Sequence, residues 1–123
     1  EIGIYTIKLT DAGAADPLFE CLPREFKGFL WHGNTFEIPE GGKLIATGEP
    51  CPVEGFVKGN IRGILFHFEV DHEEMSRWLD HWEEGLSAVN KTRDQVLENV
   101  RVVEAEMRQN AERLISNFLK MMN

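Results

Sequence analysis

The residues best suited to proton transfer are His67 and Glu69, which lie two positions apart in the apolar run 64–70. Side chains at every second position of a strand point to one face, so both share a face with Leu65. The opposite face carries the apolar residues Ile64, Phe66, Phe68 and Val70. A carboxylate that binds one imidazole nitrogen leaves the other free to take a proton from a third group. The spacing fits a general base, and it fits a structural pair at a strand end equally well.

The composition predicts one globular domain with its own core. The chain has 123 residues, of which 42% are hydrophobic, and it is too short for two domains of ordinary size. Its net charge of -8 argues against a basic nucleic-acid-binding surface. No run approaches the roughly 18 apolar residues that span a bilayer, and no signal-peptide pattern opens the chain. We therefore expect no nucleic-acid partner and no membrane partner.

The two cysteines, Cys21 and Cys51, lie far apart and form no C-x-x-C motif. This usage suits a reducing compartment, so we expect a cytoplasmic protein. A disulfide between them stays open, although the same usage argues against it. The chain starts at Glu1, without an initiator methionine and directly in a strand-like segment, which predicts a piece of a longer polypeptide.

Short strands separated by turn residues account for the first seventy positions. Prolines and glycines between the apolar runs mark the loops. The two-residue turn 59–60, Gly-Asn, is typical of a hairpin between the last two strands. We expect these strands at 3–9, 29–32, 43–47, 55–58 and 61–67.

A helical periodicity replaces that pattern after Val70. Asp71 is a candidate N-cap, and Glu74 lies three residues on, at the spacing of a capping box. We expect a helix at about 72–85, because Gly85 is a natural stop. One face of this helix carries Met75, Trp78, Leu79 and Trp82.

A second helix is expected at about 92–121. Thr92 and Gln95 form a second capping-box pair at its start. Its apolar stripe consists of Val96, Val100, Val103, Met107, Ala111, Leu114, Phe118 and Met121. We expect the stripe to pack on the domain. Pairing with a partner helix is the alternative, although the stripe drifts too far for a strict heptad.

Four segments resemble motifs of the class I glutamine amidotransferases. Residues 29–39, FLWHGNTFEIP, resemble WHGDTFDLP, and residues 66–70, FHFEV, resemble FHPEV. Residues 3–10, GIYTIKLT, resemble GWxPVxLT, and residues 16–23, DPLFECLP, resemble DPLFxxLP. The motifs follow in order over nearly the whole chain. They are most similar to the stand-alone members related to the glutaminase domain of GMP synthase.

The resemblance implies a three-layer, flavodoxin-like α/β fold with a central, mainly parallel sheet, of which residues 1–123 would be the C-terminal part. It implies hydrolysis of the glutamine side-chain amide to glutamate and ammonia, with the ammonia passed to an acceptor. His67 would be the general base and acid, and Glu69 its orienting partner. The implied partners are glutamine, an N-terminal half that bears the nucleophile, and an ammonia-accepting synthetase domain or subunit. We expect no cofactor and no metal.

The chain departs from the family pattern most at the nucleophile. The triad needs a thiolate on a tight, glycine-rich turn, which in the family lies upstream of every motif seen here. Cys21 lies in FECLP and Cys51 lies between two prolines, and neither has flanking glycines. We therefore expect this chain alone to be inactive as a glutaminase.

Smaller departures are Phe68, in place of the proline between the histidine and the glutamate, and Asn34, in place of the aspartate of WHGD. His32, in the same motif, is a candidate substrate-binding residue, and a packing role fits it as well. Two alternatives stay open. One is a metal site built from His32, His67, Glu69 and His72, although no zinc pattern accompanies them. The other is a catalytically inactive, amidotransferase-like interaction module.

Overall fold

Five antiparallel strands form one sheet in the computed structural model, which describes residues 1–122. The strands are β1 (Ile2–Leu9), β2 (Glu25–Trp31), β3 (Lys43–Gly48), β4 (Gly55–Lys58) and β5 (Ile61–Ile64). Their order across the sheet is β2-β1-β3-β4-β5. The predicted hairpin joins β4 to β5, and Gly59 adopts the positive φ of 57° that its turn requires.

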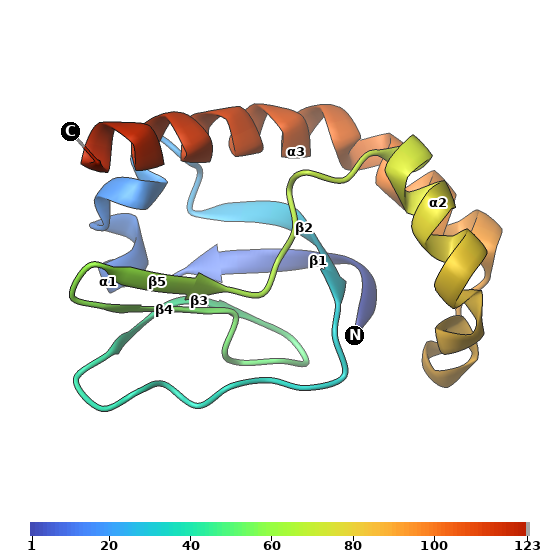
Figure 1. The fold of residues 1–123 in the computed structure, drawn as a ribbon, viewed down its shortest axis with the longest axis horizontal. Coiled ribbons are helices and arrows are strands. Elements are labelled where there is room, and N and C mark those ends of the chain that lie inside the picture. The colour runs from blue at the N-terminus through green and yellow to red at the C-terminus, as the bar shows by residue number, and fades with distance from the viewer. Residues whose placement is uncertain (123) are drawn as a thin grey trace.

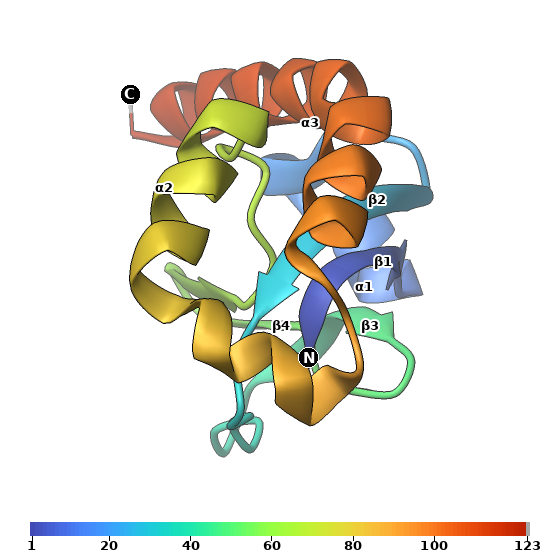
Figure 2. The ribbon, with the colours of Figure 1, turned by 90° about the vertical axis from the view of Figure 1, so that its right-hand side faces the viewer.

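Helices cover one side and one end of the sheet (Figure 1). The short elements are α1 (Asp11–Ala14), the 3-10 turn η1 (Pro17–Phe19) and the 3-10 segment η2 (Glu83–Val89). The long helices are α2 (His72–Trp82) and α3 (Arg93–Met121). α3 runs along the sheet and packs on η1, β1 and β2, while α2 lies beyond the end of β2. Figure 2 shows α2 beside the first half of α3, with η2 connecting them below.

The core lies between the sheet and α3. In the first half of β2, Glu25 and Lys27 are exposed and Phe26 and Gly28 are buried, because one face of the sheet meets this helix. Only glycine fits at position 13 of α1, since a Cβ there would lie 2.0 Å from the carbonyl oxygen of Ile45. The fully buried side chains include Ile7, Phe29, Leu30, Ile45, Met75, Leu79, Val100 and Met107. Among residues 1–122, no helix has the length and apolar composition needed to cross a bilayer.

The strand expected at 61–67 is three residues too long. β5 ends at Ile64, and the chain then crosses to β2, where His67 forms an isolated bridge with Phe29. The predicted alternation nevertheless holds from Phe66 onward, since Phe66, Phe68 and Val70 are buried while His67 is half-buried and Glu69 exposed. Ile64 is expected to share the burial of Phe66, Phe68 and Val70, but it is exposed at the sheet edge.

The first helix expected from sequence ends earlier than Gly85. α2 ends at Trp82, and the chain continues as η2 up to a left-handed Asn90. Asp71 is the N-cap, but the Glu74 side chain binds Trp78 and Arg77 instead of completing the capping box.

The second helix has the predicted capping box of Thr92 and Gln95. The predicted apolar stripe does not hold near the C-terminus, where Phe118 is exposed. Asn117 takes the inward position because its amide donates to the carbonyl oxygens of Leu18 and Glu20.

The mainly parallel sheet that the resemblance implies is not found among residues 1–122. All four strand pairings there are antiparallel. For β3–β4 and β4–β5 the antiparallel pairing follows from the short connections, because a parallel pair needs a crossover of a dozen or more residues.

Candidate active site

His67 and Glu69 form a direct hydrogen-bonded pair on the segment between β5 and α2. The His67 Nδ1 atom lies 2.6 Å from the Glu69 Oε1 atom. Because a carboxylate only accepts, Nδ1–H donates and Nε2 keeps its lone pair in the neutral ring. Among residues 1–122, no hydrogen bond engages Nε2, and the His67 side chain is 34% exposed. The ring is thus oriented by its carboxylate and open to a third group.

The backbone of His67 is fixed by β2. Its N–H donates to the carbonyl oxygen of Phe29 at 2.8 Å, and the N–H of Phe29 returns a bond at 3.0 Å. Phe29 is fully buried in the core. A site on a strand-bound segment is held more precisely than one on a free loop.

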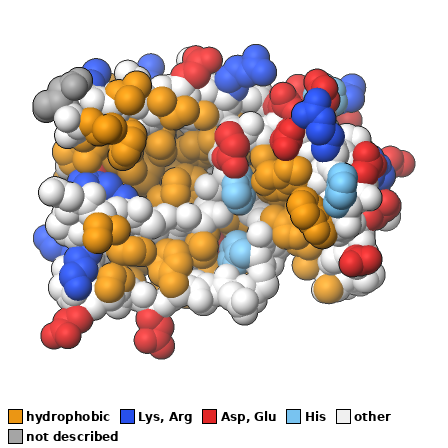
Figure 3. Space-filling model, in the orientation of Figure 1, with side chains coloured by type: hydrophobic (Ala, Val, Ile, Leu, Met, Phe, Trp, Pro, Cys, Tyr) orange, Lys and Arg blue, Asp and Glu red, His pale blue; other side chains and the backbone are white. Residues whose placement is uncertain are grey.

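An aromatic wall stands beside the His67 ring. Trp78 of α2 meets the ring edge-on, with centroids 5.5 Å apart. Together with Trp31 and Trp82, the two residues line an apolar depression of about 480 Å³. Figure 3 shows hydrophobic side chains gathered beside histidines at the α2 end of this face. The wall shields one side of the imidazole from water and leaves the other accessible.

The charge of Glu69 is favoured by this arrangement. The hydrogen bond from His67 is the main cause that lowers the pKa of Glu69, and the residue's own N–H lowers it further, while partial burial opposes both. Glu69 is 63% exposed, so water screens part of this effect. The pair therefore holds a carboxylate against an imidazole, which is the arrangement that an oriented general base requires.

The metal site built from His32, His67, Glu69 and His72 is not formed. His72 lies instead at the start of α2, where its Nδ1 atom is 3.0 Å from Glu104 Oε2 on α3. The N–H of His72 donates to the same carboxylate, and these contacts lower the pKa of Glu104, the backbone bond most.

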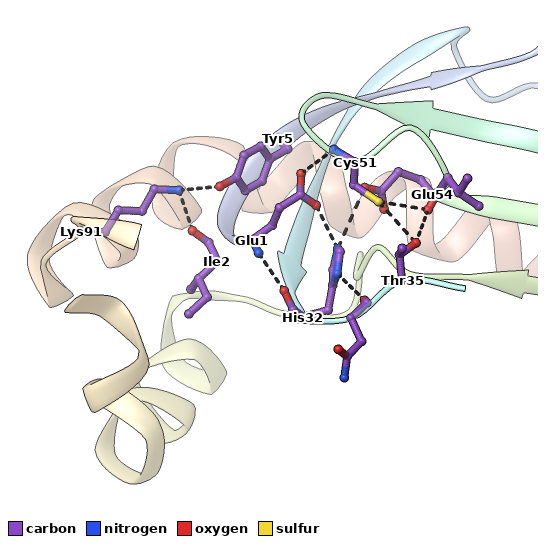
Figure 4. Close-up of polar contacts among 10 residues, drawn as sticks. Glu1, Ile2, Tyr5, His32, Thr35, Cys51, Glu54 and Lys91 are labelled. Atoms are coloured by element: carbon purple, nitrogen blue, oxygen red, sulfur yellow. Dashed lines mark hydrogen bonds and ion pairs between the residues drawn. The ribbon is translucent and has the colours of Figure 1, made fainter. Parts of the chain in front are cut away.

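His32 lies in a polar cluster instead of facing solvent. Its Nε2 atom is 2.9 Å from Glu1 Oε2 and 4.0 Å from Glu54 Oε1, and its Nδ1 atom binds the carbonyl oxygen of Asn34 at 2.8 Å. Figure 4 shows these groups together with Cys51 and Thr35. Burial, with the Glu1 charge second, raises the pKa of Glu54 to about 7.

Sequence reasoning missed Glu1 and Glu54. Glu54 is fully buried although it directly precedes the short strand β4. A carboxylate inside an otherwise apolar run, VEGFV, was the available signal.

Both cysteines are free thiols. Cys21 is exposed, and its carbonyl oxygen binds Arg113 on α3. The Cys51 thiol contacts Val53 and Thr35. Within residues 1–122, no hydrogen bond connects either thiol to His67.

Residues 1–122 thus form a mixed α/β structure that holds a histidine–glutamate pair beside β2. No family model matches the chain. Its sequence is 39% identical over 75 residues to a glutamine-hydrolyzing GMP synthase of Thermosipho africanus, covering 58% of this chain and 14% of that protein. It is 35% identical over 77 residues to one subunit of the glutamine-hydrolyzing GMP synthase of Thermococcus kodakarensis, covering 60% of this chain and 39% of that protein.

A solved structure of a glutamine amidotransferase from Thermotoga maritima has the same fold. It matches with a TM-score of 0.82 and 28% identity, over 94% of this chain and 49% of that one. The match confirms the predicted three-layer, flavodoxin-like α/β fold class. The chain is thus related to the class I glutamine amidotransferases, and it spans less than half the length of these relatives.

Proposed function

We propose that the protein is a glutamine amidotransferase, in which His67 and Glu69 are two members of a Cys-His-Glu triad. The observation that carries the proposal is the 2.6 Å bond between His67 Nδ1 and Glu69 Oε1, which leaves Nε2 unengaged within residues 1–122. The glutamine-hydrolyzing relatives supply the substrate class, the side-chain amide of glutamine.

In each half of the reaction, His67 would take up one proton as a base and then release it as an acid. Its Nε2 takes the proton of a cysteine thiol, and the thiolate attacks the amide carbon of glutamine. The imidazolium then donates that proton to the leaving nitrogen, so ammonia departs as the C–N bond breaks and a thioester remains. Water attacks the thioester with His67 again as base, which releases glutamate and restores the thiol. Glu69 keeps Nδ1 protonated and stabilises the imidazolium.

The nucleophile is proposed to lie outside residues 1–123. Cys21 is near the C-terminal half of α3, and Cys51 is engaged with Thr35 and Val53. Neither follows the glycine-flanked turn that a thiolate nucleophile uses. We therefore infer that residues 1–123 are the C-terminal part of one amidotransferase domain, in a cytoplasmic protein whose N-terminal half brings the cysteine. The names of the relatives support an ammonia-accepting synthetase, present in the same chain or in a partner chain.

An inactive interaction module is the second candidate. It is favoured by the apolar side chains that α3 exposes, among them Val102, Ile115, Phe118 and Leu119. The sequence before Glu1 discriminates between the two functions. A G-x-C-x-G turn after a strand supports the enzyme, whereas serine, glycine or a gap at the cysteine position supports the module.

The rate of ammonia release from glutamine tests the proposal in the full-length protein. His67→Ala should reduce the rate by roughly 100-fold or more, because it removes the general base. The matched control is His81→Ala on α2, whose exposed ring binds the carbonyl oxygen of Arg77 and lies beside Trp82. It should leave the rate within about twofold of the starting protein, because its ring touches no reacting group. A His67→Ala rate within a few-fold of the starting protein would refute the assignment, provided that circular dichroism shows a folded variant.

A further inference from the structure

Four side chains with metal-binding atoms converge at the start of β1. They are Glu1, His32, Cys51 and Glu54, and their ligand atoms all lie within 4.8 Å of one another. The residues come from three separate segments, which the sheet brings together (Figure 4). The cluster is separate from the His67–Glu69 pair, and the proposed triad does not use it.

The His32 ring presents an acceptor to the cluster. Its Nδ1 atom lies 2.8 Å from the carbonyl oxygen of Asn34, which can only accept, so Nδ1 carries the hydrogen. In the neutral ring the Nε2 lone pair then faces Glu1 Oε2 at 2.9 Å. Two acceptors at this distance repel each other unless a proton or a cation lies between them. Histidines that ligate metals are oriented in this way, with the other ring nitrogen bound to a carbonyl or carboxylate.

Glu54 also requires a proton or a cation beside its carboxylate. Its side chain is fully buried, and neither carboxylate oxygen has a hydrogen-bond donor within residues 1–122. A buried carboxylate without a partner is costly in its charged form, so such groups are normally protonated, paired or bound to a metal. Glu1 Oε2 and His32 Nε2 are likewise buried without a bonded partner. Buried acceptors without a donor between them form a site for a positive charge.

We propose that Glu1, His32, Cys51 and Glu54 bind one divalent zinc ion. One nitrogen, one sulfur and two carboxylate oxygens are a ligand set that Zn²⁺ accepts in tetrahedral geometry. Zinc lies about 2.0–2.1 Å from nitrogen and oxygen ligands, which places tetrahedral neighbours roughly 3.3 Å apart. The distances of His32 Nε2 to the two glutamates, 2.9 and 4.0 Å, bracket this value. The Cys51 thiol, now 3.3 Å from the carbonyl oxygen of Val53, releases its proton on binding.

Metal titration of the purified full-length protein, first stripped with a chelator, tests the site. Calorimetry with Zn²⁺ should give one ion per chain at this site. Titration with Co²⁺ should give a thiolate-to-cobalt charge-transfer band in the near ultraviolet. Cys51→Ser should abolish the band, and Cys21→Ser, which changes the exposed cysteine, should retain it.

Glu54→Gln and His32→Ala should weaken zinc binding by more than roughly 100-fold, since loss of an outer-shell partner alone costs 10–100-fold. His72→Ala is the control for histidine loss, because His72 pairs with Glu104 outside the cluster. Glu54→Gln keeps the shape of the side chain, so it reports on ligation even if His32→Ala unfolds. The proposal is overturned if no zinc binds, if Glu54→Gln binds as tightly as the starting protein, or if Cys51→Ser keeps the cobalt band. If no zinc binds, a shared proton holds the cluster together, and in the other two cases the metal binds elsewhere.

Discussion

Replacing Glu104 by alanine should destabilise the protein by about 2 kcal/mol at pH 7. Glu104 on α3 accepts the backbone N–H of His72 at 2.8 Å and the His72 Nδ1–H at 3.0 Å. These bonds fasten the first turn of α2, the helix that carries Trp78 against His67. A hydrogen bond to a charged group contributes about 1.5–3 kcal/mol. The Glu104 side chain is 28% exposed, so we place the sum of the two bonds near the lower end.

The stabilisation that Glu104 contributes should be larger at pH 7 than at acidic pH. The bonds from His72 lower the pKa of Glu104 in the folded protein. Because this pKa is lower in the folded protein, ionised Glu104 stabilises the fold at pH values above its pKa in the unfolded chain, which is near 4.3. The stabilisation is lost as the pH falls through the pKa of Glu104 in the folded protein. Glu104→Gln keeps an acceptor but no charge. It should therefore be less stable than the starting protein at pH 7 by about 1 kcal/mol, and the difference should shrink as the pH falls below about 4.3.

Urea unfolding, followed by circular dichroism over this pH range, measures both effects. Glu106→Ala is the matched control, because Glu106 is exposed on the same helix and makes no side-chain hydrogen bond within residues 1–122. It should change the free energy of unfolding by less than about 0.5 kcal/mol. The reasoning fails if Glu104→Ala and Glu106→Ala are equally stable at pH 7. It also fails if the gap between the starting protein and Glu104→Gln is as large at pH 3 as at pH 7.

Two further predictions concern activity and stability. The 123-residue chain on its own should release no ammonia from glutamine, because we propose that its nucleophile lies outside residues 1–123, and a rate above the buffer blank in a metal-free preparation would contradict that proposal. Asp16→Ala should lower the free energy of unfolding by about 3 kcal/mol in a urea titration, because it leaves the Arg62 guanidinium, bound through two 3.1 Å contacts, without its buried partner. Asp11→Ala, which removes the exposed partner of Arg24, should cost less than about 0.5 kcal/mol, and equal losses would refute the burial argument.

Local patterns explain what could be predicted from the sequence. The His67–Glu69 contact joins residues two apart on one face, so the pleat alone brings them together. The Thr92–Gln95 capping box is equally local, as is the turn at Gly59. Each feature can be predicted from a few neighbouring residues, although the position of the His67–Glu69 pair in the fold depends on the bridge between His67 and Phe29.

Contacts between residues far apart in the sequence explain the features that could not be predicted. Glu1, His32 and Glu54 meet only because β1 pairs with β2 and with β3, and sequence spacing does not give that order. The end of β5 at Ile64 depends on a crossing to β2 that the apolar pattern of residues 61–67 conceals. Asn117 is buried because two carbonyl oxygens near η1 accept its amide, which a hydrophobic stripe cannot show.

The location of the reactive cysteine tests the central claim most directly. Full-length protein is treated with an electrophilic diazoketone analogue of glutamine, which alkylates an activated thiolate, and the modified peptide is identified by mass spectrometry. The account predicts a single labelled cysteine outside residues 1–123, and loss of that labelling in His67→Ala. A label on Cys21 or Cys51, or no label on any cysteine, would contradict the claim that His67 and Glu69 complete a triad begun elsewhere in the protein.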